Sequence, residues 1–342
     1  MITEVLKYES EGALERAAQL IREGALVGIP TETVYGLGAS AYNASACLDI
    51  FKAKGRPGDN PLIVHISKPE EAEKIAYTSE LYYKLASKFM PGPLTVIMPK
   101  RDIIPSEVTA GLDSVAVRCP MHSVARKIIE LSGVPIAAPS ANKSGMPSPT
   151  TAQHVYNDMN GIIPLIIDAG ACDVGVESTV IKLDGDSIIL LRPGAVTPQM
   201  LESVCQSVTI SSAVTRELER GETPLSPGMK YKHYAPRADL YLVADAVDFE
   251  AYVKEKSKSE KCAVMCYDEE EKLFDGIITL PVGKREDIKE QTKRLFDLLR
   301  RADDIGVDTI YAHLPNQNGE SLAIYNRMIR ACAHRIIGGT NG

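Results

Sequence analysis

Residues 211–237 divide the chain into two stretches with different patterns. This segment has little hydrophobic periodicity, and its Thr-Pro-Leu-Ser-Pro-Gly at 223–228 is rich in residues that break helices and strands. The length of 342 residues also corresponds to about two domains of roughly 150 residues each. We therefore expect a larger domain over 1–210, a linker over 211–237 and a smaller domain over 238–342.

The stretch before the linker predicts a mixed α/β sheet. Short apolar runs typical of buried strands occur among segments with helical spacing, without a strict alternation of the two. The expected strands are 25–29, 62–66, 94–98, 115–119, 135–138, 165–168, 179–183 and 188–191. The expected helices are 12–23, 44–53, 69–76, 80–89, 122–131 and 151–158. This pattern favours a twisted mixed sheet with flanking helices over a strict βαβ repeat.

The stretch after the linker alternates regularly and predicts a small Rossmann-like parallel α/β domain with three layers. The expected strands are 240–243, 263–266, 277–280 and 309–314, and the expected helices are 248–258, 285–302 and 320–335. Cys262 and Cys266 lie four residues apart in an extended segment, which puts both on one face. We interpret them as buried free thiols.

Composition and charge exclude several classes of protein. The formal net charge is −7, whereas a protein devoted to nucleic acid needs a dense basic face. The chain has seven cysteines, an odd number, and no C-x-x-C motif, which indicates a reducing compartment. The N-terminus has no signal-peptide pattern, and no apolar run approaches the ~18 residues of a membrane helix. We therefore expect a cytoplasmic protein without membrane contact.

The first candidate ligand segment is Pro30-Thr-Glu-Thr-Val-Tyr-Gly-Leu-Gly38, which follows a predicted buried strand. Its hydroxyls and bare backbone amides at a strand end suit a small polar ligand. Gly36-Leu-Gly38-x-x-Ala41 also fits a loose dinucleotide fingerprint. We discount that match, because five residues intervene after the strand and Arg56 stands where the fingerprint requires an acid.

The second candidate is a cluster of cations at 52–56, just before turn residues and Asn60-Pro61. Lys52, Lys54 and Arg56 could simply face solvent at a helix C-terminus, which favours positive charge. The segment also lies near the mouth of a predicted strand. There Lys54 and Arg56 could hold phosphate oxygens, with arginine binding bidentately.

The third candidate, Ala138-Pro-Ser-Ala-Asn-Lys-Ser-Gly-Met-Pro-Ser148, has the hydroxyl, amide and glycine content of a phosphate or nucleotide loop. Its Ser140-Ala-Asn-Lys143 fits the S-x-x-K pattern of serine acylating enzymes, but no S-D-N or K-T-G accompanies it. Arg118 and Arg192 each follow an apolar strand, where an arginine is most often a surface residue. Converging with Lys54 and Arg56, they would form an anion pocket. The chain has no P-loop.

Taken together, these segments resemble the YrdC-like family, in the long two-domain form of the threonylcarbamoyl-AMP synthases. The motifs occur in order between residues 30 and 194. They are Pro-Thr-Glu-Thr-Val-Tyr-Gly-Leu-Gly (30–38), Lys-Gly-Arg-Pro (54–57), Asn-Pro-Leu (60–62), Pro-Gly-Pro-Leu-Thr (91–95), Val-Arg-Cys-Pro (117–120), Ser-Ala-Asn-Lys-Ser-Gly (140–145), Glu-Ser-Thr-Val (177–180) and Arg-Pro-Gly (192–194). The linker's Ser-Pro-Gly-Met-Lys-Tyr-Lys-His-Tyr-Ala-Pro (226–236) resembles the connector of the long form.

The resemblance implies an enzyme that makes threonylcarbamoyl-AMP and pyrophosphate from L-threonine, bicarbonate or CO2, and ATP. Mg²⁺ would accompany the ATP. The product would pass to a tRNA threonylcarbamoyl transferase, which modifies the adenosine next to the anticodon, with only a weak direct contact of this chain with tRNA.

The resemblance also assigns roles to residues. The cations at the phosphates, expected to be catalytic, are Lys54 and Arg56. The implied ATP-binding residues are Arg56, Asn60, Ser114, Ser140, Asn142, Ser148, Arg192, Tyr231 and Tyr234. The implied L-threonine-binding residues are Thr33, His65, Arg118, Ala138 and Ser178, with Arg118 pairing with the carboxylate. No side chain is implied as a metal ligand, since the ATP phosphates would hold most of the Mg²⁺.

Several alternatives stay open at the level of sequence. The linker is either a lid over the active site, to which Tyr231 and Tyr234 would belong, or an inert tether. The whole chain could be an RNA-binding YrdC-like module without catalysis, which its net charge of −7 disfavours. It could also be a carbamoyl-adenylate-forming maturation enzyme, although that reading expects additional zinc and acylphosphatase-like modules upstream.

Overall fold

The computed structural model describes residues 1–214 and 234–339. The chain divides into two compact units, Met1–Ser144 with Ser148–Lys230, and Gly145–Pro147 with Tyr231–Gly342. The tripeptide Gly145–Pro147 belongs to the second unit because Ala235 N donates to Gly145 O at 2.9 Å and Arg300 Nη2 donates to Pro147 O at 2.6 Å. Nothing in the sequence predicts that this tripeptide groups with the second unit.

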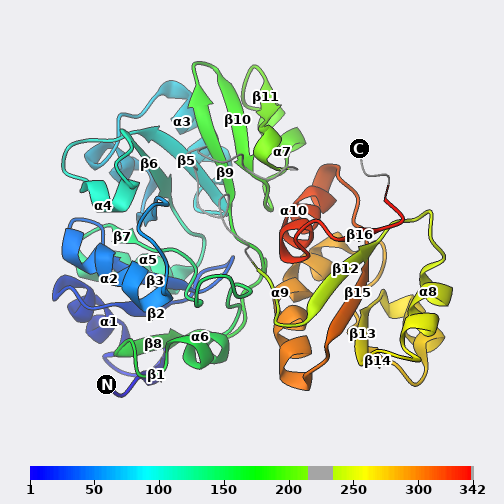
Figure 1. Ribbon diagram of the computed structural model, residues 1–342. Coiled ribbons are helices and arrows are strands. Elements are labelled where there is room, and N and C mark those ends of the chain that lie inside the picture. The colour runs from blue at the N-terminus through cyan, green and yellow to red at the C-terminus, as the bar shows by residue number, and fades with distance from the viewer. Residues whose placement is uncertain (215–233, 340–342) are drawn as a thin grey trace. The chain divides into compact units, whose positions relative to one another are not determined.

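The described part of the first unit is a mixed α/β structure (Figure 1). Its strands are β1 (Glu4–Lys7), β2 (Val27–Ile29), β3 (Gly36–Ser40), β4 (Ile63–His65), β5 (Leu94–Pro99), β6 (Ser114–Arg118), β7 (Ile136–Ala137), β8 (Leu165–Asp168), β9 (Thr179–Asp184), β10 (Ser187–Arg192) and β11 (Val208–Ile210). Its helices are α1 (Ala13–Arg22), α2 (Ala44–Lys54), α3 (Glu80–Phe89), α4 (Ser106–Thr109), α5 (Ser123–Ser132), α6 (Ala152–Met159) and α7 (Pro198–Glu202), with 3-10 turns η1 (Pro69–Lys74) and η2 (Ser212–Val214).

These strands form one twisted sheet in the order β1-β8-β2-β3-β7-β4-β6-β5-β9-β10-β11. Parallel pairs such as β4–β6 and β5–β9 stand beside antiparallel pairs such as β5–β6 and β9–β10, so the predicted mixed sheet is confirmed. α1 and α5 pack together over the buried residues of β2 and β8, and their apolar stripes form one core cluster with Ile21, Ile128 and Leu165.

Strand β3 was not predicted, and the segment 30–38 is not one continuous loop. Its second half, Gly36–Ser40, pairs with β2 and β7. Glycine is needed there because a Cβ on Gly38 would lie 3.0 Å from Ile136 Cγ2 and 3.3 Å from Ile29 Cδ1. Because Gly36 and Gly38 lie within a paired strand, they do not form a dinucleotide loop. The true loop after β2 is Pro30–Tyr35.

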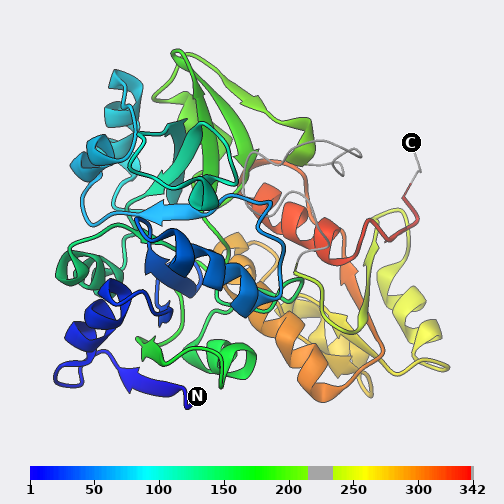
Figure 2. The ribbon, with the colours of Figure 1, turned by 60° about the vertical axis from the view of Figure 1, so that its left-hand side comes forward.

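The second unit holds a five-stranded parallel sheet in its described residues, in the order β14-β13-β15-β12-β16 (Figure 1). Figure 2 shows the helices and strands of this unit, coloured yellow to red, in a second view. The strands are β12 (Asp239–Val243), β13 (Cys262–Met265), β14 (Ile278–Thr279), β15 (Thr309–His313) and β16 (Ile336–Ile337). The helices are α8 (Phe249–Lys256), α9 (Ile288–Ile305) and α10 (Leu322–Ala331), with 3-10 turns η3 (Asp268–Phe274) and η4 (Gly319–Ser321).

Side chains alternate between the two faces of this sheet, as the period of a strand requires. Cys262, Val264 and Cys266 face α8 and join its core cluster with Phe249 and Val253. Both cysteines are buried and free, as predicted. The predicted small parallel α/β domain is therefore confirmed.

Candidate active site

The Pro30–Tyr35 loop is shaped by the hydroxyls of its own threonines. Thr31 Oγ1 accepts hydrogen bonds from the backbone N of Thr33 and of Val34, both at 3.2 Å, and lies 2.9 Å from Thr33 Oγ1. Short-range contacts of this kind replace helix or sheet hydrogen bonds in a tight turn. The turn fixes the directions of Glu32 and Thr33, both of which are buried.

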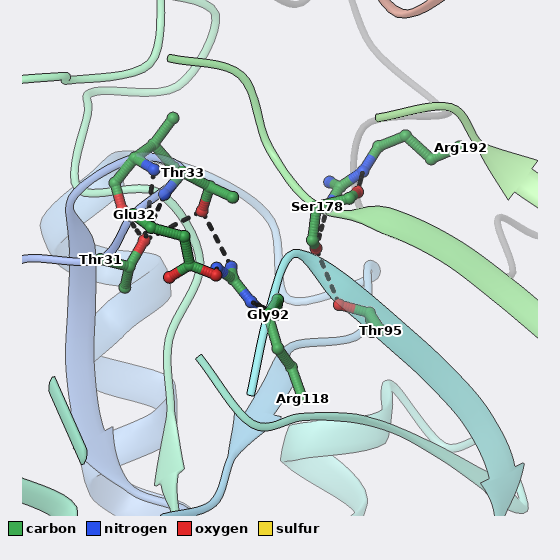
Figure 3. A network of polar contacts seen from close by, with 9 residues as sticks. Thr31, Glu32, Thr33, Gly92, Thr95, Arg118, Ser178 and Arg192 are labelled. Atoms are coloured by element: carbon green, nitrogen blue, oxygen red, sulfur yellow. Dashed lines mark hydrogen bonds and ion pairs between the residues drawn. The ribbon is translucent and has the colours of Figure 1, made fainter. Parts of the chain in front are cut away.

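Arg118, the last residue of β6, reaches into this loop (Figure 3). Its Nη2 forms an ion pair with Glu32 Oε1 at 2.7 Å, its Nη1 donates to Thr33 Oγ1 at 2.9 Å, and its Nε donates to Gly92 O at 3.4 Å. The side chains of Arg118 and Glu32 are only 4% and 5% exposed. Among the described residues, the Arg118 guanidinium hydrogen-bonds through Nε and Nη1, whereas Nη2 has the ion pair alone, so both terminal nitrogens keep N–H groups for a ligand.

The charge on Arg118 determines the ionisation of its neighbours. Burial alone would raise the pKa of Glu32, but the charge and hydrogen bond of Arg118 outweigh it and lower that pKa below its usual value. Glu32 is thus an anion that neutralises the buried guanidinium. The pair leaves a site with little net charge and fixed N–H donors, which suits a carboxylate ligand.

Three polar residues form a row across adjacent strands. In the sheet register, His65 of β4 lies opposite Arg118 of β6, and Arg118 lies opposite Thr95 of β5. Burial, followed by the nearby charge of Arg118, lowers the pKa of His65 to about 3. His65 is therefore neutral at physiological pH and can donate and accept hydrogen bonds without adding charge.

Thr95 connects this row to Ser178, which precedes β9. Thr95 Oγ1 and Ser178 Oγ lie 2.7 Å apart. Arg192, the last residue of β10, donates from Nε to Ser178 O at 3.0 Å and from Nη2 to Ser178 Oγ at 3.2 Å (Figure 3). Gly194 allows this approach, because a Cβ there would lie 2.5 Å from Thr179 N. The Arg-Pro-Gly motif therefore holds the Glu-Ser-Thr-Val motif directly.

Lys54 organises the loop after β7. Its Nζ donates to Ser140 O at 2.5 Å and to Asn142 O at 2.7 Å, and lies 3.4 Å from Asn142 Oδ1. Ser140 Oγ in turn donates to Asn142 Oδ1 at 2.6 Å. The lysine is buried, so it is not a solvated helix-end cation. Its short contacts are to loop carbonyls, which gives it a positioning role in addition to any contact with phosphate.

The other predicted ATP-binding residues of this unit are placed around that loop and along the sheet. Arg56 is buried, with its guanidinium over the Phe51 ring at 5.9 Å from the centroid. Ser148 Oγ donates to Glu177 Oε1 at 2.5 Å. Asn60 is fully buried ahead of β4. Ser114 begins β6 whereas Arg118 ends it, so a ligand that touched both would lie along the strand.

Ala138 follows β7, and its backbone N donates to Ile63 O at 2.9 Å. Tyr234 lies in the second unit, stacked on Phe296 at 5.1 Å and with Arg327 5.5 Å from its ring centroid. The structure thus groups Tyr234 with second-unit residues, whereas the other predicted site residues that are described belong to the first unit. Tyr231 and most of the expected lid, 226–236, lie outside the described residues.

Sequence reasoning missed Glu32, Thr95 and Glu177 as members of these networks. A polar residue within an apolar strand, Leu-Thr-Val-Ile-Met at 94–98, was the available signal for Thr95. Glu32 and Glu177 lie inside quoted motifs, but their partners, Arg118 and Ser148, lie in other segments of the chain. Only the folded sheet brings these residues together.

Within residues 1–214 and 234–339, no group of three His, Cys, Asp or Glu side chains could hold a metal ion. Over the same residues, no helix is both long enough and apolar enough to span a bilayer.

Comparisons with known proteins define the class. Residues 19–194 match the Sua5–YciO–YrdC family, described as telomere recombination, and residues 196–333 match the threonylcarbamoyl-AMP synthase C-terminal domain. The fold is thus that of a YrdC-like domain joined to that second domain.

Relatives that match the chain over nearly its whole length show which family it belongs to. The threonylcarbamoyl-AMP synthase of Pyrococcus abyssi is 44% identical, covering 98% of this chain and 99% of its own, and that of Bacillus subtilis is 41% identical, covering 95% and 94%. The structure of P. abyssi Sua5 complexed with L-threonine superposes with a TM-score of 0.89 at 43% identity, covering 98% of this chain and 99% of that one. The chain belongs to the threonylcarbamoyl-AMP synthase family.

This membership confirms the resemblance inferred from the motifs, and with it the prediction of an enzyme of the nucleotidyltransferase type. It also decides among the alternatives. An RNA-binding module without catalysis and a maturation enzyme would not match threonylcarbamoyl-AMP synthases over nearly their whole length.

Proposed function

We propose that this protein is an L-threonylcarbamoyladenylate synthase, with the described residues of the first unit as its active site. The supporting observation is the buried Arg118, which is neutralised by Glu32 and still has N–H groups available on both terminal nitrogens. That fork suits the carboxylate of an amino acid. A relative that is 43% identical has been solved with L-threonine bound.

In the proposed reaction, bicarbonate loses hydroxide to give CO2, and the threonine ammonium loses a proton that converts this hydroxide to water. The free amine nitrogen then attacks the CO2 carbon, one C–O π bond breaks, and the nitrogen releases a second proton to solvent to leave the carbamate anion. The resulting carbamate oxygen attacks the α-phosphorus of ATP, the bond to the β-phosphate oxygen breaks, and pyrophosphate leaves. The carbamate is already an anion, so this second step needs no strong base. The main task of the site is to place two anions together, by positioning and by electrostatics.

The threonine subsite comprises Thr33, His65, Arg118, Ser178 and the backbone at Ala138. His65 is neutral and provides hydrogen-bonding groups without charge. The Thr33 hydroxyl, which accepts from Arg118, and the Thr95 and Ser178 hydroxyls, which contact each other, do the same. Such groups would be left unpaired by valine, which has the shape of threonine but no hydroxyl. We therefore expect strong rejection of valine.

The ATP subsite comprises Arg56, Asn60, Ser114, Ser140, Asn142, Ser148 and Arg192, with Lys54 holding the Ser140–Asn142 loop. Phosphate oxygens would compete for Lys54 Nζ, most easily by replacing its 3.4 Å contact with Asn142 Oδ1. Tyr231 and Tyr234 stay in the proposal as predicted ATP contacts. Catalysis is thus assigned to residues 1–210.

Mg²⁺ bound to ATP would share the phosphate charge during attack at the α-phosphorus. The described residues fit this role for the ion, because the buried cations Lys54, Arg56 and Arg192 could share the phosphate charge with it. The product would be consumed in the cytoplasm by a tRNA threonylcarbamoyl transferase, with no more than weak tRNA contact by this chain.

The decisive experiment is incubation of the protein with ATP, Mg²⁺, bicarbonate and labelled L-threonine, followed by identification of the nucleotide product. We expect pyrophosphate release that requires both threonine and bicarbonate, and a threonyl-labelled adenylate. Pyrophosphate release at the same rate without threonine or without bicarbonate would contradict the proposal. Valine in place of threonine serves as the matched control for recognition of the hydroxyl.

A further inference from the structure

The parallel sheet of the second unit has a topological switch point between β13 and β15. These neighbouring strands are parallel, but the chain leaves them in opposite directions. From β13 it continues to the adjacent β14, and from β15 it crosses β12 to reach β16. In open parallel sheets, ligands bind outside the carboxyl ends of the strands at such a point.

A cavity occupies this position. It has a volume of about 40 Å³ and is lined at the carboxyl ends of the two strands by Met265 and Tyr267 on one side and by Ala312 and His313 on the other. The remaining walls are mostly apolar and come from Val282, Gln291, Leu295, Pro315, Ile324 and Met328. The topology and the cavity therefore point independently to the same place.

A rigid polar wall stands at one side of the cavity. His313 lies between Phe249 and Tyr267, with ring centroids at 3.8 Å and 5.0 Å, and Arg285 covers the Tyr267 ring at 4.3 Å. Glu270 joins this stack, because its carboxylate lies 2.9 Å from His313 Nε2 and 2.5 Å from Arg285 Nη2. Simple core packing does not need such an arrangement, whereas a binding site needs fixed groups.

The residues around the cavity indicate which chemical groups a ligand would carry. The segment after β13 carries a run of four acids, Asp268–Glu271, and no glycine that would expose backbone amides. This disfavours phosphate, the usual ligand at switch points. Gln291 commits its Nε2 to the carbonyls of Lys284 and Arg285, so the remaining polar atom of its amide, Oε1, is a hydrogen-bond acceptor.

The volume of the cavity limits the size of the ligand. At about 40 Å³ it is well below the ~150 Å³ of a cavity that takes benzene, so it fits a small aliphatic group but no aromatic ring. We propose that the β13–β15 switch point of the second unit is a second ligand site, which binds a small molecule with a short branched aliphatic end and a neutral or cationic hydrogen-bond donor, as in a short aliphatic amine.

The test uses the full-length protein with ¹³C-methyl methionine, because Met265 and Met328 report on the cavity from two sides. The probe is isobutylamine, and inorganic phosphate is the comparison. We expect saturable shifts of these two methyl signals with isobutylamine and none with phosphate. Absence of saturation with the amine, or tighter binding of phosphate, would overturn the proposal.

Two variants test the location. Ala312→Val adds two methyl groups in the cavity wall and should weaken isobutylamine binding at least tenfold. Val264→Ile adds a methyl on the face of β13 that packs toward α8, and should leave the affinity unchanged. Equal affinity of wild type and Ala312→Val would place the probe elsewhere and refute the site. If Ala312→Val fails to fold, the wild-type titrations with amine and phosphate still decide.

Discussion

Each unit contains an arginine, a glutamate and a nearby histidine in close association, but the two clusters differ in burial. In the first unit, the side chains of Arg118 and Glu32 are 4% and 5% exposed. In the second unit, Arg285 is 55% exposed and Glu270 is 14% exposed. Burial weakens solvent screening and makes an unpaired charge expensive, so the same residue types have different energetic roles. Breaking the first pair by removing one partner should therefore cost much more stability than breaking the second.

The largest expected effect is on stability when Glu32 is removed. Glu32→Ala should lower the free energy of unfolding by about 3–5 kcal/mol, because it leaves Arg118 buried and unpaired. Urea unfolding measures this loss, and Glu32→Gln, which keeps the shape and one acceptor, should lose less. Glu80→Ala is the control, since it breaks the exposed Lys84–Glu80 pair and should be close to neutral. Equal losses for Glu32→Ala and Glu80→Ala would contradict the comparison.

The next effect concerns substrate binding. Arg118→Lys keeps the charge but loses the bidentate fork, so the KM for L-threonine should rise about 10- to 100-fold, as expected for the loss of a hydrogen bond to a charged group. Steady-state kinetics with each substrate varied in turn measures this effect. The KM for ATP is the internal control and should change little. A larger change in the KM for ATP than for threonine would show that Arg118 does not bind the carboxylate.

A smaller effect is expected when the pH is lowered, because His65 is buried in its neutral form. The folded-state pKa of His65 is lowered to about 3, whereas an unfolded histidine titrates near 6.5. Above pH ~6.5 His65 is neutral in both states and costs no stability. As the pH falls from ~6.5 toward 3, the unfolded state binds a proton that the folded state does not, so the free energy of unfolding decreases. Between pH 6 and 4.5, wild type should lose up to about 1.4 kcal/mol per pH unit more than His65→Asn. Identical pH profiles for the two proteins would show that His65 is not buried in its neutral form.

The smallest effect is expected in the second unit. Glu270→Gln should cost less than about 1 kcal/mol, because Arg285 is largely exposed and the amide can still accept a hydrogen bond. Urea unfolding at neutral pH measures it beside Glu32→Gln. A loss as large as that of Glu32→Gln would mean that exposure does not separate the two clusters.

Local signals predicted much of the fold. The helix over 80–89 was predicted with the same limits that the structure shows, since Ser79 accepts a hydrogen bond from Tyr82 N as an N-cap. The short edge strands β1 and β11 and the glycine-containing β3 were missed, because few residues and small side chains leave no period to detect. The candidate ligand segments and their arginines were predicted from motifs, and their roles stay predictions. Glu32, the ion-pair partner of Arg118, was missed because it lies in a distant loop that only the folded sheet brings to the end of β6.

The row of His65, Arg118 and Thr95 has a consequence for the synthesis of the protein. Arg118 contacts a threonine 85 positions away, and Thr95 contacts a serine 83 positions away. No short stretch of a growing chain contains this row together with its partners, so the row forms only when distant strands pair. A substrate that binds at the row would recognise only the paired sheet, and by mass action it would shift the population of nascent chains toward that form. Cellular L-threonine would then stabilise newly made enzyme as well as serve as its substrate.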